Sequence, residues 1–235
     1  YEVLRIVRGV PLFYMDHFAR LKQSVNAVGK ELSLTQGELK DDIKKLLSAN
    51  NADYCNIKVL MTWRDVGAEQ RLVYISKSYY PSQAEVEAGV KTGLFQIERK
   101  NPNVKILDKS YKEAVEKRIQ EGSFFEVLLT DNRGRITEGS KSNAFFVKEG
   151  RILTAPGEYV LKGITRQYVM QACRNAGVEV VEEFVEAGSL DKVDAAFLSG
   201  TSIKVLPVKS IDDIVLESSK NRIVDAVRRE YDKIL

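Results

Sequence analysis

The sequence has few of the residues on which several common kinds of active site depend. Its 235 residues include two cysteines, Cys55 and Cys173, and one histidine, His17. A His-rich zinc site is therefore excluded, and a Ser-His-Asp triad would have to use His17. Both cysteines lie in apolar surroundings, strand-like for Cys55 and helix-like for Cys173. The sequence predicts reduced thiols in the core, and neither a disulfide nor a metal site.

Long apolar runs and a large excess of one charge are also missing. No run approaches the length that spans a membrane and no signal peptide is visible, so we expect a cytoplasmic protein without a membrane partner. The chain begins at Tyr1, inside a strand-like run and without an initiator methionine, so we expect residues upstream of it. The formal net charge is +3, with basic residues scattered among acidic ones. This argues against nucleic acid as a partner and leaves open an anionic small molecule.

Motifs for common nucleotides are absent as well. No Gly-x-Gly-x-x-Gly follows a predicted strand and there is no Walker loop, so neither dinucleotide nor ATP binding is indicated. The composition, with 44% hydrophobic and 29% charged residues, is ordinary for a globular protein. The length accommodates one large domain or two small ones.

Apolar periodicity predicts a mixture of strands and helices in the first third of the chain. We expect Asp16 to be the N-cap of the first helix, whose buried stripe is Phe18, Leu21, Val25 and Val28. The predicted elements are strands at residues 1–6, 10–13, 57–61 and 72–75, and helices at residues 16–29 and 36–49.

The remainder of the chain mixes the two kinds of element in the same way. A loop at residues 100–105 precedes a helix that Gly122 ends, and the residues from Gly163 to Arg166 open another helix. The predicted elements are strands at residues 90–97, 124–130, 144–147, 178–181, 195–198 and 208–214, and helices at residues 109–121, 163–176 and 218–234.

One stretch interrupts this apolar pattern. Between two strand-like runs lies the sequence Thr137-Glu138-Gly139-Ser140-Lys141-Ser142-Asn143. Glu138 in isolation would be an ordinary turn carboxylate. A simple strand junction does not need a carboxylate, a glycine and small hydroxyl and amide side chains together, so the stretch indicates a functional site.

Other residues suit a small phosphorylated aromatic cofactor. A helix that begins at Gly163-Ile164-Thr165 offers backbone N–H groups and a hydroxyl to a phosphate. Arg20 would add a bidentate charged contact and Thr201 a second hydroxyl. Lys105, in a loop just before a helix, has an amine that can form a Schiff base. Glu138 would hold a protonated ring nitrogen.

Each of these residues also has an ordinary interpretation. Arg20 would otherwise be a solvated helix arginine, Thr165 a helix cap and Thr201 the end of a strand. His17, one helical turn from Arg20, is better interpreted as structural than as catalytic. Lysines are usually solvated surface charges. The neighbouring lysines Lys100, Lys109 and Lys112 compete with Lys105 for the role of the Schiff-base amine.

An ordered series of motifs carries a family resemblance over nearly the whole chain. It consists of His17-Phe18-Ala19-Arg20-Leu21, Lys105, Glu126, Thr137 to Asn143, Leu153-Thr154-Ala155-Pro156 and Leu161-Lys162-Gly163-Ile164-Thr165-Arg166. The series resembles the signature of class IV, fold-type IV, pyridoxal-phosphate enzymes. That family contains branched-chain aminotransferases, D-amino-acid aminotransferases and 4-amino-4-deoxychorismate lyase.

The resemblance implies a role for each candidate residue. Lys105 would form the Schiff base with pyridoxal 5'-phosphate and then move the α-proton of the substrate. Glu138 would pair with the pyridine nitrogen. The resemblance implies that the phosphate is bound by Arg20, the Ile164 and Thr165 amides, the Thr165 hydroxyl and Thr201, and that Leu161 packs on a ring face. Gly163, Ser142 and Asn143 would complete the cofactor site, and Tyr1 would lie on the substrate side.

Two departures from the family pattern bear on substrate recognition. The family usually has asparagine three residues after the lysine, where this chain has Asp108, and the segment that normally precedes Tyr1 is absent from the sequence. The carboxylate-binding arginines of the family would correspond to Arg64 or Arg71.

The fold expected from these patterns is mixed α/β with two domains, as in fold-type IV enzymes. Residues 1–80 form a small N-terminal domain, residues 81–87 an interdomain loop and residues 88–235 a larger pseudo-barrel domain. The resemblance also implies a cofactor between the domains and a homodimer.

The expected activity is transfer of an amino group from a branched-chain L-amino acid or a D-amino acid to a 2-oxo acid, by a ping-pong mechanism. The first alternative is a lyase that eliminates pyruvate from aminodeoxychorismate. The second is a non-catalytic protein with the same fold, against which the presence of both Lys105 and Glu138 argues.

Overall fold

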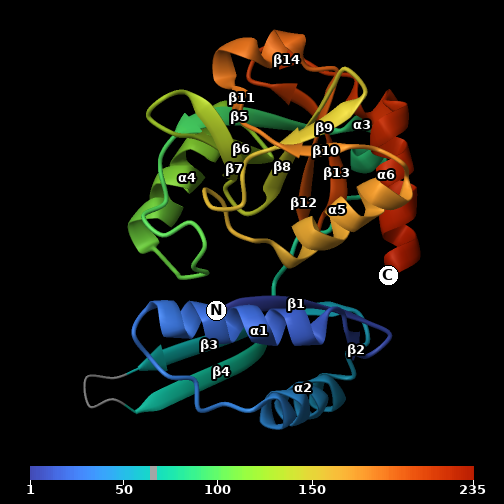
Figure 1. Ribbon diagram of the computed structural model, residues 1–235. Helices are drawn as coiled ribbons and strands as arrows, with labels where there is room; N and C mark the ends of the chain where they lie inside the picture. The colour runs from blue at the N-terminus through green and yellow to red at the C-terminus, as the bar shows by residue number, and fades with distance from the viewer. Residues whose placement is uncertain (64–67) are drawn as a thin grey trace. The chain divides into compact units, whose positions relative to one another are not determined.

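The computed structural model describes residues 1–63 and 68–235. These residues form two compact units (Figure 1). Unit 1 consists of Tyr1–Tyr79 together with Val104–Leu107, and unit 2 consists of Tyr80–Asn103 together with Asp108–Leu235. The predicted loop at residues 81–87 contains a short helix, α3 (Gln83–Ala88), because Ser82 starts it with a capping box.

The sheet of unit 1 is antiparallel, with the strand order β2-β1-β3-β4. Its strands are β1 (Glu2–Val7), β2 (Val10–Pro11), β3 (Cys55–Trp63) and β4 (Glu69–Ser76). The second strand is shorter than the predicted 10–13 because Phe13 has a left-handed backbone conformation, with φ of 53°, and a helix starts at the next residue.

Two helices accompany this sheet, α1 (Tyr14–Ala27) and α2 (Gln36–Asn50). The prediction that Asp16 is the N-cap of α1 is wrong: the N-cap is Phe13, and Asp16 lies in the first turn, where its charge is favourable for the helix dipole. In α2 the Thr35 side chain accepts the Glu38 N–H, and the Glu38 carboxylate accepts the Thr35 N–H.

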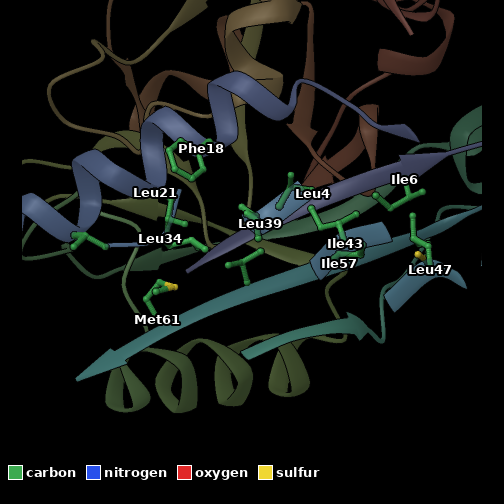
Figure 2. Close-up of a cluster of buried hydrophobic side chains, with 13 residues drawn as sticks. Leu4, Ile6, Phe18, Leu21, Leu34, Leu39, Ile43, Leu47, Ile57 and Met61 are labelled. Carbon is green, nitrogen blue, oxygen red and sulfur yellow. The ribbon is translucent and has the colours of Figure 1, made fainter. Parts of the chain in front are cut away.

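The core of unit 1 lies between the helices and the sheet (Figure 2). Leu21 of α1 and Ile43 of α2 join the same apolar cluster as Leu4 of β1 and Ile57 of β3. The predicted stripe of α1 ends one turn early, since Val28 is 46% exposed. The reason is that the helix stops at Ala27, so Val28 no longer continues its buried face.

The sheet of unit 2 is mixed, with the order β10-β9-β8-β12-β13-β5-β6-β7-β11, and β14 pairs with β13. The pairs β5–β6, β5–β13 and β9–β10 are parallel. The strands are β5 (Val90–Gln96), β6 (Glu126–Thr130), β7 (Arg135–Gly139), β8 (Asn143–Lys148), β9 (Arg151–Thr154), β10 (Val180–Glu182), β11 (Val185–Glu186), β12 (Ala195–Gly200), β13 (Lys204–Ile211) and β14 (Ile214–Val215).

One side of this sheet encloses an apolar cluster. Successive strand residues point to opposite faces. Phe146 of β8 and Leu198 of β12 belong to the same cluster as Leu128 of β6 and Ile136 of β7, although these strands are distant in the sheet order. The sheet therefore curls around the cluster, and the predicted mixed α/β fold class is confirmed.

Helices cover the other side of the same sheet. Phe145 and Phe197 stack with ring centroids 4.9 Å apart, in a cluster with Cys173 of α5 (Ile164–Asn175) and Val227 of α6 (Arg222–Ile234). Figure 1 shows α5 and α6 beside each other on this face. On another part of the sheet, Val115 of α4 (Lys109–Gly122) packs on β6.

The last helix starts later than the predicted residue 218. Ser218–Lys220 form a 3-10 turn, η2, and Asn221 then begins α6 by accepting the N–H groups of Ile223 and Val224. Another 3-10 segment, η1 (Ala187–Lys192), follows β11. Within the described residues no helix has the length and apolar character needed to cross a membrane.

Candidate functional site

Lys105 is held by two backbone hydrogen bonds within unit 1. Its N–H donates to Ser24 Oγ (3.2 Å), and its carbonyl accepts from the Tyr1 nitrogen (2.9 Å). The Lys105 Nζ lies 4.8 Å from the centroid of the Tyr1 ring, and the Nζ of Lys58 lies 4.6 Å from the same centroid. Tyr1 and Lys105, both predicted from the sequence, are therefore brought together.

Lys58 was not among the sequence-based candidates. It lies in β3 between Ile57 and Val59, both of which are fully buried. A lysine between two core residues of a strand is a visible signal in the sequence, but alternation alone assigns it to the solvated face of the sheet.

Arg20 belongs to a buried charged cluster with Glu2 and His17. Arg20 donates from Nε to Glu2 Oε1 (2.8 Å) and from Nη2 to Glu2 Oε2 (2.7 Å). His17 Nδ1 lies 2.8 Å from Glu2 Oε2 and donates to it. The exposed fractions are 1% for Glu2, 3% for His17 and 7% for Arg20, so the cluster is shielded from water.

The ionisation of the cluster follows from these contacts. Burial opposes the charge on Glu2, but the hydrogen bonds from Arg20 and His17 prevail and lower the pKa of Glu2 from 4.5 to about 2. Burial lowers the pKa of His17 below its ordinary 6.5, and Glu2 only partly opposes this. At neutral pH the cluster therefore consists of a carboxylate, a guanidinium and a neutral imidazole.

Glu138 is the charged centre of the candidate site in unit 2. It is 3% exposed and lies in β7. Its Oε1 accepts from Arg99 Nη1 (3.0 Å), while its Oε2 accepts from the Leu161 N–H (3.0 Å) and from Asn143 Nδ2 (3.4 Å). The sequence pattern pointed to Glu138, Asn143 and Leu161, but it did not point to Arg99.

Asn143 connects Glu138 to the loop that leads into α5. Its Nδ2 also donates to the Leu161 carbonyl (2.9 Å). A Cβ on Gly163 would lie 2.2 Å from Asn143 Oδ1, so a larger residue there would displace the Asn143 amide from its hydrogen bonds. Asn143 thus gathers three other predicted residues of unit 2, Glu138, Leu161 and Gly163. Another predicted residue, Thr201, follows the end of β12, the strand that pairs with β8.

Ser142 has a different environment. A buried carboxylate, Glu126, accepts through Oε1 from the Lys141 N–H (2.6 Å), from Ser142 Oγ (3.1 Å) and from Ser140 Oγ (3.3 Å). Burial raises the pKa of Glu126, and these hydrogen bonds oppose that change. A Cβ on Gly139 would lie 2.2 Å from Ser142 Oγ. In this structure the Ser142 hydroxyl therefore supports the loop from within.

Helix α5 begins at the residues for which the sequence predicts phosphate binding. Its N-cap is Gly163, and within the described residues no side chain caps it. The first N–H groups of a helix have no partner in the helix and attract anions, and here they include those of Ile164 and Thr165. The Thr165 side chain hydrogen bonds to Tyr231, whose pKa burial raises to about 12.

A cavity of about 270 Å³ adjoins Glu138 and Arg99 in unit 2. Within the described chain, Glu138 is the one predicted site residue that lines this cavity. Its lining consists of Glu98, Arg99, Pro102, Leu129, Asp131, Asn132, Arg133, Arg135, Thr137, Glu138 and Tyr159.

Three further expectations from the sequence concern Asp108, the carboxylate-binding arginines and the absence of a metal site. Asp108 is the N-cap of α4 and accepts the Tyr111 N–H (3.0 Å), a role that asparagine fills equally well. Arg71 pairs with Asp42 (2.7 Å), and Arg64 lies outside the described residues. In the described chain, no group of three or more His, Cys, Asp or Glu side chains is arranged for a metal ion, and both cysteines are free and buried.

Comparison with known proteins gives a consistent result. A family model described as "Amino-transferase class IV" matches residues 1–211. A D-alanine aminotransferase from Bacillus licheniformis is 30% identical over 223 residues, which cover 90% of this chain and 78% of that protein.

Solved structures share the fold over almost the whole chain. A Legionella pneumophila protein described as "Putative 4-amino-4-deoxychorismate lyase" superposes with a TM-score of 0.87 at 19% identity, covering 100% of this chain and 90% of that one. A putative branched-chain amino acid aminotransferase from Thermotoga maritima has a TM-score of 0.86 at 26% identity and covers 99% of this chain and 84% of that one.

Proposed function

Since this chain belongs to the class IV aminotransferase family, we propose that it is a pyridoxal-phosphate-dependent aminotransferase acting on an amino acid and a 2-oxo acid. It is an enzyme of a family that uses pyridoxal 5'-phosphate. We further propose which residues of this chain bind the cofactor and which reaction the chain catalyses.

The described side chains fit the cofactor in the chemistry of their donors and acceptors. An uncapped helix start at Gly163 and the guanidinium of Arg20 suit a phosphate dianion. A buried carboxylate, Glu138, suits a protonated pyridine nitrogen. A lysine beside an aromatic ring, Lys105 beside Tyr1, supplies the primary amine.

The observation that chiefly supports the proposal is the arrangement of Glu138. This carboxylate is 3% exposed and is oriented by Arg99, Asn143 and the Leu161 N–H. A buried carboxylate with two fixed oxygens is suited to holding a proton on an aromatic nitrogen. Held there, the cofactor would supply a protonated, electron-withdrawing ring.

The other residues take the following roles in the proposal. Lys105 would hold the cofactor through its amine and would move the α-proton, for which that amine must be neutral. Glu2 and His17 hold the Arg20 guanidinium in place for the phosphate. The amides of Ile164 and Thr165 and the Thr201 hydroxyl would bind the phosphate, and Leu161 would lie against the ring. Ser142 and Asn143 would support these residues, and Tyr1 would lie on the substrate side.

Absorbance spectroscopy tests the cofactor and the lysine together. The purified protein is mixed with pyridoxal 5'-phosphate, and its visible spectrum is compared with those of Lys105→Ala and Lys109→Ala. Lys109 is a matched control because its side chain is 90% exposed and its ion pair with Glu113 lies on the helix surface. We expect the lysine-bound band and turnover in the wild type and in Lys109→Ala and neither in Lys105→Ala. Full turnover in Lys105→Ala would refute the assignment.

A donor panel separates the transfer reaction from the lyase reaction. We expect one of the branched-chain L-amino acids or D-amino acids to bleach the band, and a 2-oxo acid to restore it. A band that no amino acid bleaches, together with pyruvate release from aminodeoxychorismate, would establish the lyase instead. The absence of any band with added cofactor would favour the non-catalytic alternative.

Two expectations about the whole protein remain part of the proposal. They are assembly as a homodimer, which the family resemblance suggests, and a cytoplasmic location. Light scattering on the eluting protein tests the first, and a mass of about 26.5 kDa, that of one chain, would contradict it.

A further inference from the structure

Arg99 contacts the carboxylate on which the proposed function depends. It lies three residues beyond the end of β5 and donates from Nη1 to Glu138 Oε1 at 3.0 Å. The side chains are 19% exposed for Arg99 and 4% for Glu138, so water screens the pair only weakly. The two residues are 39 positions apart in the sequence.

Tyr111 of α4 supports the guanidinium from another direction. The Arg99 guanidinium lies 6.0 Å from the centroid of the Tyr111 ring, within the range of a cation–π contact. The Tyr111 hydroxyl donates to the Ser140 carbonyl (3.2 Å), which is two residues beyond Glu138. Arg99 is therefore packed against a side chain that is itself attached to the Glu138 loop.

The donors to Glu138 described above, all within the described residues, differ in charge. The Leu161 N–H and the Asn143 amide fix Oε2 but are neutral, whereas Arg99 brings a full positive charge to Oε1. A cation beside a carboxylate favours its ionised form. If the carboxylate shares one proton with an aromatic nitrogen, this cation places the proton on the nitrogen.

We propose that Arg99 is a positioning residue for Glu138: it orients the carboxylate and keeps it ionised, so that a pyridine nitrogen facing Glu138 carries the proton. This inference rests on the proposed function, because it concerns the ring nitrogen of the cofactor. It deepens that function by naming the residue that determines where the shared proton resides.

Other charged groups line the cavity that adjoins the pair, and two of the carboxylates among them have partners of their own. Asp131 is engaged by Arg135, whose Nε and Nη2 lie 2.7 and 2.6 Å from Asp131 Oδ2. Glu98 accepts the Asn132 N–H (2.8 Å). The titratable and charged groups lining the adjoining cavity are Glu98, Arg99, Asp131, Arg133, Arg135, Glu138 and Tyr159.

The test uses pyridoxal 5'-phosphate labelled with ¹⁵N in the ring and bound to the full chain at neutral pH. The ¹⁵N chemical shift distinguishes a protonated from a neutral ring nitrogen. We compare the wild type with Arg99→Met, Arg99→Gln and Arg99→Lys. The matched control is Arg118→Met, because Arg118 likewise pairs with a carboxylate, that of Asp212, and lies over an aromatic ring, that of Phe124.

We expect a protonated nitrogen in the wild type, in Arg99→Lys and in Arg118→Met. In Arg99→Met and Arg99→Gln the shift should move toward the neutral nitrogen. In these two variants kcat should fall roughly 10- to 100-fold with little change in KM, a size typical of a misaligned catalytic group.

Each other outcome has a defined meaning. A wild-type chain that binds no labelled cofactor refutes the proposed function, and the role of Arg99 with it. A wild type with a neutral ring nitrogen, or an unchanged shift in Arg99→Gln, overturns the role of Arg99 while the lysine-bound band still supports the proposed function. If Arg99→Met does not fold, Arg99→Gln decides the question, since its shorter amide side chain keeps hydrogen-bond donors and removes the charge.

Discussion

Replacing Glu2 by glutamine removes one negative charge from the buried cluster in unit 1 and leaves its shape nearly intact. Arg20, which is 7% exposed, then keeps its positive charge without the carboxylate that receives its Nε and Nη2. Breaking a buried ion pair by removing one partner typically costs about 3–5 kcal/mol. The pKa of Glu2 supports this range, because a decrease from 4.5 to about 2 corresponds to about 3 kcal/mol of stability at neutral pH.

The pH dependence provides a second, independent signature. A carboxyl whose pKa is lower in the folded state stabilises the fold above its unfolded pKa. That contribution is lost as the pH falls from 4.5 toward about 2. The pKa of His17 is lowered by burial, so this residue binds a proton more readily when unfolded and weakens the fold as the pH drops below 6.5. Both groups therefore make the wild type less stable in acid.

The assay is urea denaturation of the wild type and of Glu2→Gln at pH 8, 5.5 and 4. We expect Glu2→Gln to lose about 3–5 kcal/mol at pH 8 and the difference to narrow below pH 4.5. The control is Asp42→Asn, which breaks the exposed pair with Arg71 and should cost less than about 1 kcal/mol. Equal stability of Glu2→Gln and the wild type at pH 8 would refute the reasoning.

Three other predictions follow from close contacts and burial. Gly163→Ala should lower the affinity for the cofactor, because the new Cβ would lie 2.2 Å from Asn143 Oδ1. Gly188→Ala is the control, since Gly188 has open space around it, and it should bind the cofactor normally in a fluorescence titration. Glu126→Ala should lower the free energy of unfolding by about 2–4 kcal/mol, and Glu126→Gln should lower it much less, since only glutamine retains an acceptor for the loop. Thermal denaturation measures both, and equal losses of stability would contradict this. The Cys173 thiol, whose pKa burial raises to about 12, should resist a thiol reagent at pH 8 until the protein is unfolded, and rapid labelling of the native protein would disprove its burial.

Local patterns predicted most of the elements. The alternation of Ile57, Val59 and Met61 identified β3, and all three are buried. The start of α5 at Gly163 and Ile164 was also predictable, because glycine followed by a helical apolar pattern is a local signal. Such features depend on neighbouring residues in the sequence.

The misplaced boundaries have local conformational causes. Asp16 has the side chain of a good N-cap, but the left-handed backbone of Phe13 starts α1 two residues before the expected cap. Helix α6 begins late because Asn221 caps it. Propensity rules do not determine which of several possible caps a chain uses.

The contacts that orient the charged groups were beyond prediction from one sequence. Arg99 and Glu138 are 39 residues apart, and Glu2 and Arg20 are 18 residues apart on different elements. Most arginines and glutamates are solvated, so composition and spacing do not indicate which of them are buried together. Only the folded topology brings these pairs within hydrogen-bond distance.

The assignment of Val104–Leu107 to unit 1 has a consequence for modular engineering of this protein. The chain enters unit 2 at Tyr80, returns to unit 1 for these four residues and then enters unit 2 again at Asp108. No single cut therefore separates the units. A chimera that exchanged only residues 1–79 with a relative would keep its own Lys105 but surround it with the relative's counterparts of Tyr1, Ser24 and Lys58. Recombination at the visible domain boundary would thus change the setting of the lysine without changing the lysine itself.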